Sequence, residues 1–386
     1  MTTTDASTLE RAIDPGHGVL AQYIGALQGA GLVVALVPAH NEQDGIELAL
    51  DSLAAQTRPP DLVVVVADNC TDGTVSLVRG RADAVAVETV GNTAKKAGAL
   101  NQVLDEVLPM LDGDDAILVM DADSALDPGF VEGAIARLGT RAAGRHGSVI
   151  GGVGGTFRGG RGGGYVGMLQ RNEYVRYARD VRRKRGKVLV LTGTAALFQV
   201  SVLRAVVEAR ADGRLPGGQA HVYDTHVLTE DNELTLGLLH LGYGILSPRE
   251  CLLETEVMTT WRALWSQRLR WKRGALENLA DYGLTRVTAQ YWGRQLLTHV
   301  GMLVTAVYLA TIVYSLAFAA TVHVQPVWAA VTLIFMIERV VSVRERGKWQ
   351  MLLASVLVFE MAFDFFLQAA QAKAFWDTIT HRERNW

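Results

Sequence analysis

A long apolar stretch near the end of this chain most constrains what it can fold into. No charged residue occurs from Gln295 to Thr321, and the residues from Gly301 to Ala320 are nearly all apolar. A helix needs about 20 such residues to cross the ~30 Å hydrocarbon core of a bilayer. A helix of that length without a polar face is unusual in a soluble protein. The stretch therefore predicts a membrane-spanning helix.

Two further apolar segments follow, and both contain charged residues. Val327–Val343 is interrupted by Glu338-Arg339, which makes it a marginal span. Met351–Ala372 carries Glu360 and Asp364, four positions apart on one helix face. These two carboxylates must point into a helix bundle or a polar cavity, because lipid cannot solvate them.

Basic residues predict how these segments are oriented. The loop Arg344-Glu345-Arg346-Gly347-Lys348 is basic and is expected in the cytosol, so the first span leads out and the second leads back. A full third crossing would place His381-Arg382-Glu383-Arg384 outside, against the same rule. We therefore expect two or three spans, with the last segment tilted or partly interfacial. The first residues lack the basic start and apolar core of a signal peptide, so we expect the N-terminus in the cytosol.

Length, charge and cysteine content set broader limits. A chain of 386 residues has room for one large domain with an appendage, or for two domains. A formal net charge of −3 gives no electrostatic case for binding nucleic acid. Cys70 and Cys251 are too few for a disulfide framework and suit a reducing compartment.

Strand-like and helix-like segments alternate in the first third of the chain. Short apolar runs rich in β-branched residues predict strands at Val33–Val37, Leu62–Val66, Ala84–Val87 and Ala116–Met120. Helices are expected between them at Ile46–Gln56, Thr74–Arg81 and Ala97–Leu108. This alternation implies an α/β fold with a parallel sheet and right-handed crossovers. Such sheets bind ligands beyond the carboxyl ends of their strands.

Polar residues follow three of these strands directly. The loops are Pro38-Ala39-His40-Asn41-Glu42, the segment from Asp68 to Thr74, and Asp121-Ala122-Asp123. Turns favour Asp and Asn, which explains any one loop but not all three together. We therefore expect a ligand site at this edge of the sheet. A glycine-dense stretch, Gly151–Gly164, lacks the Lys-Ser/Thr ending of a phosphate loop and is interpreted as a flexible connection.

Asp121 and Asp123 have the spacing of a cation site. Side chains two apart in extended backbone point to the same side, so these carboxylates would repel each other. A divalent cation relieves that repulsion, and hard oxygen ligands suit Mg²⁺ or Mn²⁺. The cation would complete its shell with substrate phosphates.

Two later motifs have a helical context. Thr229-Glu230-Asp231 precedes an amphipathic helix, where threonine followed by acids is also good N-cap chemistry. Gln267-Arg268-Leu269-Arg270-Trp271 lies in a helical stripe with tryptophans, as expected at a membrane interface. Arg270 and Trp271 point about 100° apart on such a helix, so they can reach different ligands.

The ordered set of Asp68, Asp121-Ala122-Asp123, Thr229-Glu230-Asp231 and Gln267–Trp271, followed by an apolar tail, resembles the D…DxD…TED…QxxRW signature of membrane-embedded family 2 glycosyltransferases. That group contains the cellulose, chitin, hyaluronan and poly-N-acetylglucosamine synthases. The resemblance implies a GT-A fold, which is a Rossmann-like, mostly parallel sheet, followed by interfacial and transmembrane helices. It covers roughly Val33 to Asn278.

The resemblance also implies roles for individual residues. Asp231 is the general base, and Asp121 and Asp123 hold the metal, Asp121 also contacting the donor. The expected donor-binding residues are Pro38, His40, Glu42, Asp68, Lys96, Asp121, Gln267 and Arg270. The expected acceptor-binding residues are Glu230, Trp271, Thr192, Gly193 and Thr194. Lys96 begins a Lys-Ala-Gly-Ala-Leu-Asn segment like the one that lies beside the nucleotide in the family.

The activity implied is a metal-dependent, inverting transfer of sugar from a UDP-sugar to a glycan or lipid-linked acceptor. The protein would be a multi-pass protein of the plasma membrane with a cytosolic catalytic domain, as a homo-oligomer or with accessory subunits. The family's large synthases have transmembrane helices before the catalytic domain and a gating-loop motif, and neither is found here. Processive polymer synthesis and transfer of one or a few sugars both stay open. A nucleotidyltransferase and a non-catalytic membrane scaffold are the alternatives from other classes.

We expect four regions along the chain. They are an N-terminal extension at 1–30, the glycosyltransferase domain at 31–258, an amphipathic interface region with QxxRW at 259–293, and membrane helices with an interfacial tail at 294–386.

Overall fold

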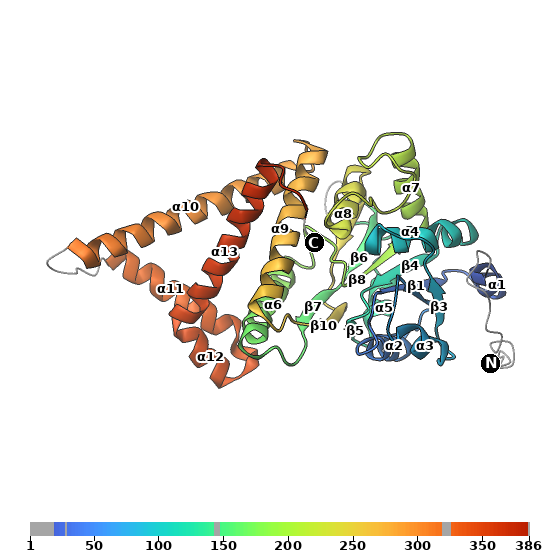
Figure 1. Cartoon of the computed structure of the whole chain (residues 1–386), viewed down its shortest axis with the longest axis horizontal. Helices are drawn as coiled ribbons and strands as arrows, with labels where there is room; N and C mark the ends of the chain where they lie inside the picture. The colour runs from blue at the N-terminus through green and yellow to red at the C-terminus, as the bar shows by residue number, and fades with distance from the viewer. Residues whose placement is uncertain (1–18, 28, 143–146, 319–325, 385–386) are drawn as a thin grey trace. The chain divides into compact units, whose positions relative to one another are not determined.

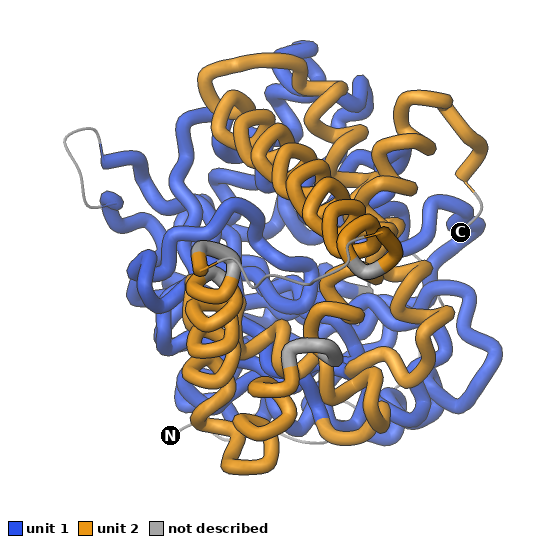
Figure 2. The backbone as a smooth tube through the Cα atoms, turned by 90° about the vertical axis from the view of Figure 1, so that its left-hand side faces the viewer, with its two compact units in different colours: residues 1–160, 181–256 blue, residues 161–180, 257–386 orange. Residues whose placement is uncertain are grey.

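In the computed structural model, which describes residues 19–27, 29–142, 147–318 and 326–384, the chain divides into two units. Unit 1 comprises residues 1–160 and 181–256, and unit 2 comprises residues 161–180 and 257–386 (Figure 2). Unit 1 holds every strand that the structure describes, and unit 2 is helical in its described residues. The four regions expected from the sequence stay a prediction.

The first four strands of unit 1 form the parallel half of its main sheet. They pair side by side in the order β3-β2-β1-β4. All three pairings are parallel, as the alternating pattern predicted. Their bounds are β1 (Val33–Ala39), β2 (Leu62–Ala67), β3 (Val85–Glu88) and β4 (Ala116–Met120). β1 and β2 are buried along almost their whole length, because helices cover both faces of a parallel sheet. Continuous valine-rich runs are the sequence form of such strands.

The second half of the sheet is mixed. β8 pairs antiparallel with both β4 and β6, and β9 runs parallel to β6. A second sheet has the order β5-β10-β7. The bounds are β5 (Ser124–Leu126), β6 (Ile150–Gly154), β7 (Thr156–Gly159), β8 (Ala195–Gln199), β9 (Gly244–Leu246) and β10 (Leu252–Thr255).

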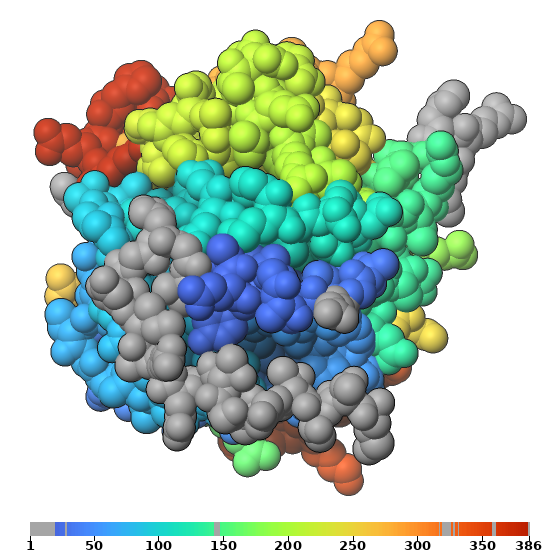
Figure 3. All heavy atoms as spheres, turned by 90° about the vertical axis from the view of Figure 1, so that its right-hand side faces the viewer, coloured from blue at the N-terminus to red at the C-terminus, as the bar shows by residue number. Residues whose placement is uncertain are grey.

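Helices pack on the two faces of the main sheet (Figure 1). Ile46 and Leu53 of α2 and Phe130 of α5 pack on the face that presents Ala35 and Val37 of β1. On the molecular face drawn in Figure 3, α1 (dark blue) lies beside α4 (cyan). The helices of unit 1 are α1 (Val19–Ala26), α2 (Ile46–Ala54), α3 (Thr74–Arg79), α4 (Lys95–Val107), the 3₁₀ turn η2 (Leu108–Met110), α5 (Phe130–Ile135), α7 (Val200–Ala211) and α8 (Glu230–His240).

The glycine-dense stretch is not the flexible connection that we expected. It forms β6 and β7, and β6 is buried throughout. A Cβ on Gly152 would lie 2.6 Å from Leu191, and one on Gly155 would lie 2.3 Å from Leu253. These glycines are therefore needed because neighbouring side chains pack against the bare backbone.

Unit 2 consists of long helices. Their bounds are α6 (Gly164–Arg183, of which residues 164–180 belong to unit 2), α9 (Trp261–Tyr282), α10 (Ala289–Phe318), α11 (Pro326–Ser342), the 3₁₀ turn η3 (Arg344–Arg346), α12 (Lys348–Ser355) and α13 (Leu357–Ile379). α13 packs along α9, where Ala374 contacts Leu269 and Leu276. The predicted segment Met351–Ala372 is divided between two helices, α12 and α13.

One helix of the described chain is long and apolar enough to cross a membrane by itself. It is Ala289–Ser315, with a mean hydropathy of 1.9 and none of its most apolar window buried. Lys348–Ser355 and Glu360–Ile379 would form a second crossing only if the pair, bent by 70°, counts as one span. The predicted span Gln295–Thr321 coincides with α10 up to Phe318, and its last three residues lie outside the described ranges. Val327–Val343 corresponds to α11.

The two carboxylates of α13 point into the helix bundle, as predicted. Glu360 is 3 % exposed and accepts hydrogen bonds from Asn172 Nδ2 at 3.0 Å and Arg176 Nη1 at 2.8 Å. Asp364 pairs with Arg339 of α11. Both charges are therefore neutralised inside unit 2.

Candidate active site

The carboxyl ends of β1, β2 and β4 carry the loops that the sequence singled out. The strands are neighbours in register, with Pro38 opposite Val66 and Leu36 opposite Val119. Their loops therefore begin at one edge of the sheet, where open α/β sheets bind ligands. This edge is the candidate donor side of the site.

Asp68 lies at the end of β2 and is held by several donors. Its Oδ1 accepts hydrogen bonds from Asn69 Nδ2 at 2.9 Å, Thr89 Oγ1 at 2.8 Å and Asn92 Nδ2 at 2.8 Å. The ring nitrogen Nδ1 of His40 lies 2.6 Å from the backbone oxygen of Asp68. The structure thus brings His40 and Asp68 together, as the sequence predicted, and fixes the orientation of the carboxylate.

Three non-glycine residues of the surrounding loops adopt left-handed backbone. Asn41 has φ of 57°, Asn69 of 50° and Lys95 of 52°. Asparagine tolerates this region better than most residues, whereas lysine does so rarely. Strained positions of this kind concentrate at binding sites, where the surrounding structure maintains them.

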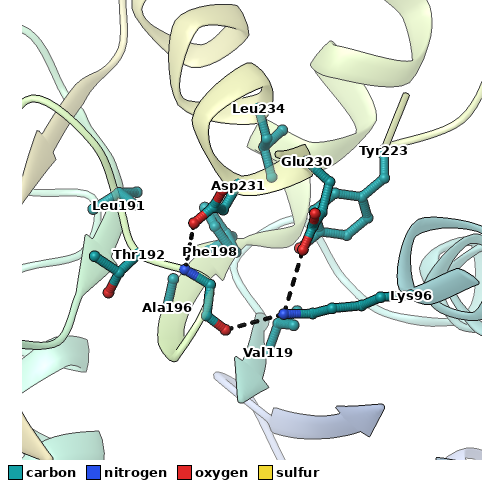
Figure 4. Close-up of a pocket in the computed structure, with 11 residues that line it drawn as sticks. Lys96, Val119, Leu191, Thr192, Ala196, Phe198, Tyr223, Glu230, Asp231 and Leu234 are labelled. Atoms are coloured by element: carbon teal, nitrogen blue, oxygen red, sulfur yellow. Dashed lines mark hydrogen bonds and ion pairs between the residues drawn. The ribbon is translucent and has the colours of Figure 1, made fainter. Parts of the chain in front are cut away.

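Lys96, the second residue of α4, lies at the centre of the site (Figure 4). Its ammonium group pairs with Asp121, lies 3.4 Å from Glu230 Oε1, and donates to Gly193 O at 3.3 Å. Burial opposes the charge, but Asp121, Glu230 and Asp231 outweigh it and raise the pKa of Lys96. Burial also raises the pKa of Asp121, against the effect of Lys96. One cation therefore joins the DxD motif to the TED motif.

Asp231 is oriented by two backbone amides. Gly193 N donates to Oδ2 at 2.8 Å, and Asn232 N donates to Oδ1 at 2.7 Å. Burial and the neighbouring Glu230 raise its pKa from 3.8 to about 6, although Lys96 and the two amides act in the opposite direction. A carboxylate with this pKa is ionised at neutral pH and is more basic than an ordinary aspartate.

Thr229 occupies the N-cap position of α8, as its sequence context suggested. Its side chain makes no capping hydrogen bond, however. The negative charges of the acids in the first turn interact favourably with the positive end of the helix dipole. In addition, the carboxylate of Asp231 accepts a hydrogen bond from the backbone amide of Gly193. The motif thus begins a helix and also holds the carboxylate of Asp231 in a fixed orientation.

The Thr192-Gly193-Thr194 turn connects the two acidic motifs. The backbone oxygen of Thr194 accepts from Asp121 N at 3.0 Å. A Cβ on Gly193 would lie 3.1 Å from Lys96 Nζ and 3.3 Å from Asp231 Oδ2. A side chain at this position would crowd the cation and the carboxylate, which would have to shift by a few tenths of an ångström to admit it.

Five of the predicted site residues line one pocket of unit 1, namely Lys96, Thr192, Gly193, Glu230 and Asp231, and sequence reasoning missed the rest of its lining. The pocket is formed by Lys96, Val119, Leu191, Thr192, Gly193, Ala196, Phe198, Tyr223, Glu230, Asp231 and Leu234 (Figure 4). Tyr223 was not predicted because it lies in a loop without a periodic pattern. Its backbone is fixed by Asn101, whose amide group donates to Tyr223 O at 2.8 Å and accepts from Tyr223 N at 3.0 Å. The apolar lining residues have the sequence pattern of ordinary core positions, so only the fold identifies them.

Carboxylates also gather around Asp123. Its Oδ1 accepts from Ser124 Oγ at 3.0 Å and from Thr255 Oγ1 at 3.4 Å. Burial and the charges of Asp123, Glu256, Asp121 and Asp72 raise the pKa of Glu42 to about 7. In the part of the chain that the structure describes, no group of three or more His, Cys, Asp or Glu forms a ready-made metal cage. The surplus of negative charge fits a divalent cation that takes one or two carboxylates and completes its shell with phosphate oxygens.

The QxxRW motif lies on α9 in unit 2. Thr260 caps this helix by accepting from Ala263 N at 3.2 Å, and Leu264 and Leu269 are buried. Gln267, Arg270 and Trp271 are each half-buried. Their roles toward donor and acceptor stay predictions.

Comparison with known proteins identifies the family to which this chain belongs. Residues 30–274 match the family described as "Glycosyltransferase like family 2". The chain therefore belongs to glycosyltransferase family 2. The nucleotidyltransferase and scaffold alternatives are thereby set aside.

Individual relatives are more distant. The chain is 26 % identical over 263 residues to poly-β-1,6-N-acetyl-D-glucosamine synthase of Staphylococcus aureus, in a match that covers 66 % of this chain and 58 % of that protein. It is 27 % identical over 261 residues to the probable glycosyltransferase YdaM of Bacillus subtilis, covering 63 % and 54 %. The chain thus spans somewhat over half the length of the curated relatives it matches.

One solved structure shares the fold over most of the chain. The mannosyltransferase PcManGT from Pyrobaculum calidifontis, solved with GDP-Man and Mn²⁺, superposes with a TM-score of 0.51 at 19 % identity. The match covers 94 % of each chain. It supports the predicted GT-A fold, with a mixed sheet followed by C-terminal helices.

Proposed function

We propose that the protein transfers a sugar from a UDP-sugar to a glycan or lipid-linked acceptor at a membrane, with inversion at the anomeric carbon. The observation that carries this proposal is the position of Lys96, which lines the pocket beside Glu230 and the half-buried Asp231 and also pairs with Asp121 of the DxD motif. Sugar transfer requires the residues that bind the donor diphosphate, here the DxD motif, to lie next to the residues that activate the acceptor hydroxyl, here the TED motif.

Asp231 acts as the general base. Its carboxylate takes the proton of the acceptor hydroxyl while that oxygen attacks the anomeric carbon of the donor. The new carbon–oxygen bond forms as the bond to the β-phosphate oxygen breaks, and UDP leaves with the bonding electrons. One base and a single displacement convert an α-linked donor into a β-linked product. The amides of Gly193 and Asn232 hold both carboxylate oxygens in place for this step.

Asp121 and Asp123 are the carboxylates that would hold Mg²⁺ or Mn²⁺. A bound cation would neutralise charge that develops on the departing diphosphate. Lys96 supplies a positive charge next to these carboxylates, since it pairs with Asp121. We also assign Arg270 and Gln267 of α9 to the donor diphosphate.

We assign Pro38, His40, Glu42 and Asp68 to the nucleoside. The hydrogen bonds from Asn69, Thr89 and Asn92 converge on Oδ1 of Asp68, which supports a role for Oδ2 as acceptor from a base N–H. Thr192, Gly193, Thr194 and Glu230 are assigned to the acceptor side together with Trp271.

The membrane assignment rests on α10 and on the apolar faces of the C-terminal helices. Leu297, Leu303 and Val313 of α10 are each at least 65 % exposed, which suits lipid as the neighbour. We propose a plasma-membrane protein with a cytosolic catalytic domain that crosses the membrane more than once. Polymer synthesis and transfer of one or a few sugars remain alternatives for the product, as do accessory subunits or self-association.

The experiment is a transfer reaction with purified protein in lipid, followed by NMR of the product. A β-linkage from an α-linked donor, lost in Asp123→Asn, is the expected result. An α-linkage would contradict the single displacement. Release of pyrophosphate instead of UDP would contradict glycosyl transfer itself.

A further inference from the structure

Arg268 lies inside the QxxRW motif at a position to which the motif assigns no role. Its side chain is only 3 % exposed, which is rare for arginine. Nη2 lies 2.7 Å from Glu173 Oε2 of α6, and Nη1 donates to Gln267 Oε1 at 3.4 Å. A buried guanidinium with a carboxylate partner has a fixed position, because moving it would leave two charges unpaired.

The same guanidinium covers an aromatic ring of the motif. Its Cζ lies 4.5 Å from the centroid of the Trp271 ring and 5.8 Å from that of Tyr174. Both distances are within the ~6 Å range of a cation–π contact. Trp271 is half-buried, so part of its ring surface stays accessible although Arg268 lies over it.

We propose that Glu173 and Arg268 are positioning residues that set the orientation of the Trp271 indole for stacking on an acceptor pyranose ring. Glu173 fixes the guanidinium, and the guanidinium lies over one face of the indole. A sugar would then stack on the remaining surface of a ring that is already oriented, which lowers the entropic cost of binding. This inference rests on the proposed acceptor role of Trp271.

Lysine would not replace arginine here. The planar guanidinium can stack on an indole and bond a carboxylate in its own plane, whereas an ammonium group is a point charge. Glu173 also interacts electrostatically with Lys272: burial lowers the pKa of Lys272, and the charge of Glu173 opposes that effect. Glu173 therefore balances two cations, and its removal should disturb Arg268 first, because Arg268 is its hydrogen-bonded partner.

The first test reads the ring itself and needs no activity. The chain has eight tryptophans, so protein labelled with 5-fluorotryptophan gives a ¹⁹F NMR spectrum in which Trp271→Phe identifies one resonance. Arg268→Met and Glu173→Gln should shift or broaden that resonance, and Arg268→Lys should not restore it. Arg262→Met, which changes an exposed arginine of the same helix, should leave it in place. An unmoved resonance in both Arg268→Met and Glu173→Gln would overturn the proposal.

The second test compares transfer with hydrolysis. The ratio of UDP released to sugar transferred should rise about tenfold in Arg268→Met and Glu173→Gln, as expected for loss of one cation–π contact. In the Trp271→Ala background, Arg268→Met should add nothing further, because residues that act through one group are not additive. An equal effect of Arg268→Met in both backgrounds would show a general structural role instead.

The two tests separate the possible failures. A wild-type protein that releases no UDP would contradict the proposed function, while the ¹⁹F spectrum would still decide the positioning of Trp271. If Arg268→Met does not fold, Glu173→Gln and Arg268→Lys, which keep size or charge, decide both tests.

Discussion

The substitution Asp231→Asn separates chemistry from folding at this site. A carboxamide of the same shape can still accept one of the two backbone hydrogen bonds, from Gly193 N or Asn232 N. It cannot take a proton from an acceptor hydroxyl. Loss of a positioned general base lowers kcat by ~10²–10⁴. Affinity for UDP should change little, because the general base Asp231 acts on the acceptor hydroxyl and is not among the residues assigned to the nucleotide.

The pKa of Asp231 fixes the size and sign of two further effects. A pKa of about 6 instead of 3.8 means that the ionised carboxylate disfavours the folded state. By linkage this penalty reaches up to ~3 kcal/mol above pH 6 and vanishes below about pH 4. Asp231→Asn should therefore keep or raise the stability at pH 7 while it removes activity. The wild-type rate should fall tenfold per pH unit below about pH 6, where the base becomes protonated.

Asp115 provides a matched control for this experiment. It is 3 % exposed and, like Asp231, accepts from two backbone amides, Leu32 N at 2.8 Å and Asp112 N at 2.7 Å. It does not line the pocket. Asp115→Asn should lower the thermal midpoint and leave kcat per folded molecule unchanged. UDP release and thermal melting are measured on the same samples of both variants. A wild-type kcat in Asp231→Asn would refute the reasoning, and so would a loss of activity that only matches the fraction of unfolded protein.

Three other predictions concern the charges and the packing of unit 1. Lys96→Met should move the acid limb of the pH–rate profile above pH 6, because Lys96 lowers the pKa of Asp231; an unchanged or lower limb would contradict the pairing. Chelation of divalent cations should abolish UDP release and Mn²⁺ or Mg²⁺ should restore it, since Asp121 and Asp123 hold like charges together; full activity in excess chelator would remove the metal from the proposal. Gly155→Ala should lower the free energy of unfolding by ~1–3 kcal/mol through overpacking against Leu253 and Phe130, and denaturant titration should show a much smaller change for Gly113→Ala, whose Cβ would meet only an ordinary contact at 3.5 Å.

The sequence was sufficient for the parallel half of the sheet, and the reason is physical. Valine-rich runs such as Leu62–Val66 are strands buried on both faces, and their carboxyl ends carry the polar loops. The motif residues that line the pocket were singled out by their order along the chain, because turn or N-cap preference explains each acidic cluster by itself but not the whole set. The antiparallel strand β8 was not predicted, since a short apolar run does not reveal the direction in which it pairs.

Other features depend on long-range packing. The glycines in β6 and at its junction with β7 have a composition typical of a flexible linker, and only the side chains of Leu191 and Leu253 show why they are needed. The lining residue Tyr223 is fixed by Asn101, 122 positions away in the sequence. The break between α12 and α13 at Val356 lies within an apolar run that contains no glycine or proline as a signal.

The most direct test of the proposed glycosyl transfer is nucleotide release by the purified protein in lipid. A panel of UDP-sugars, with GDP-mannose as a second nucleotide, is supplied with Mn²⁺ or Mg²⁺ and then with chelator. We predict release of UDP from one UDP-sugar, sensitive to chelator and lost in Asp231→Asn. Release from no nucleotide sugar, together with UDP binding that is unaffected by the cation, would contradict the assignment of the pocket as a donor site.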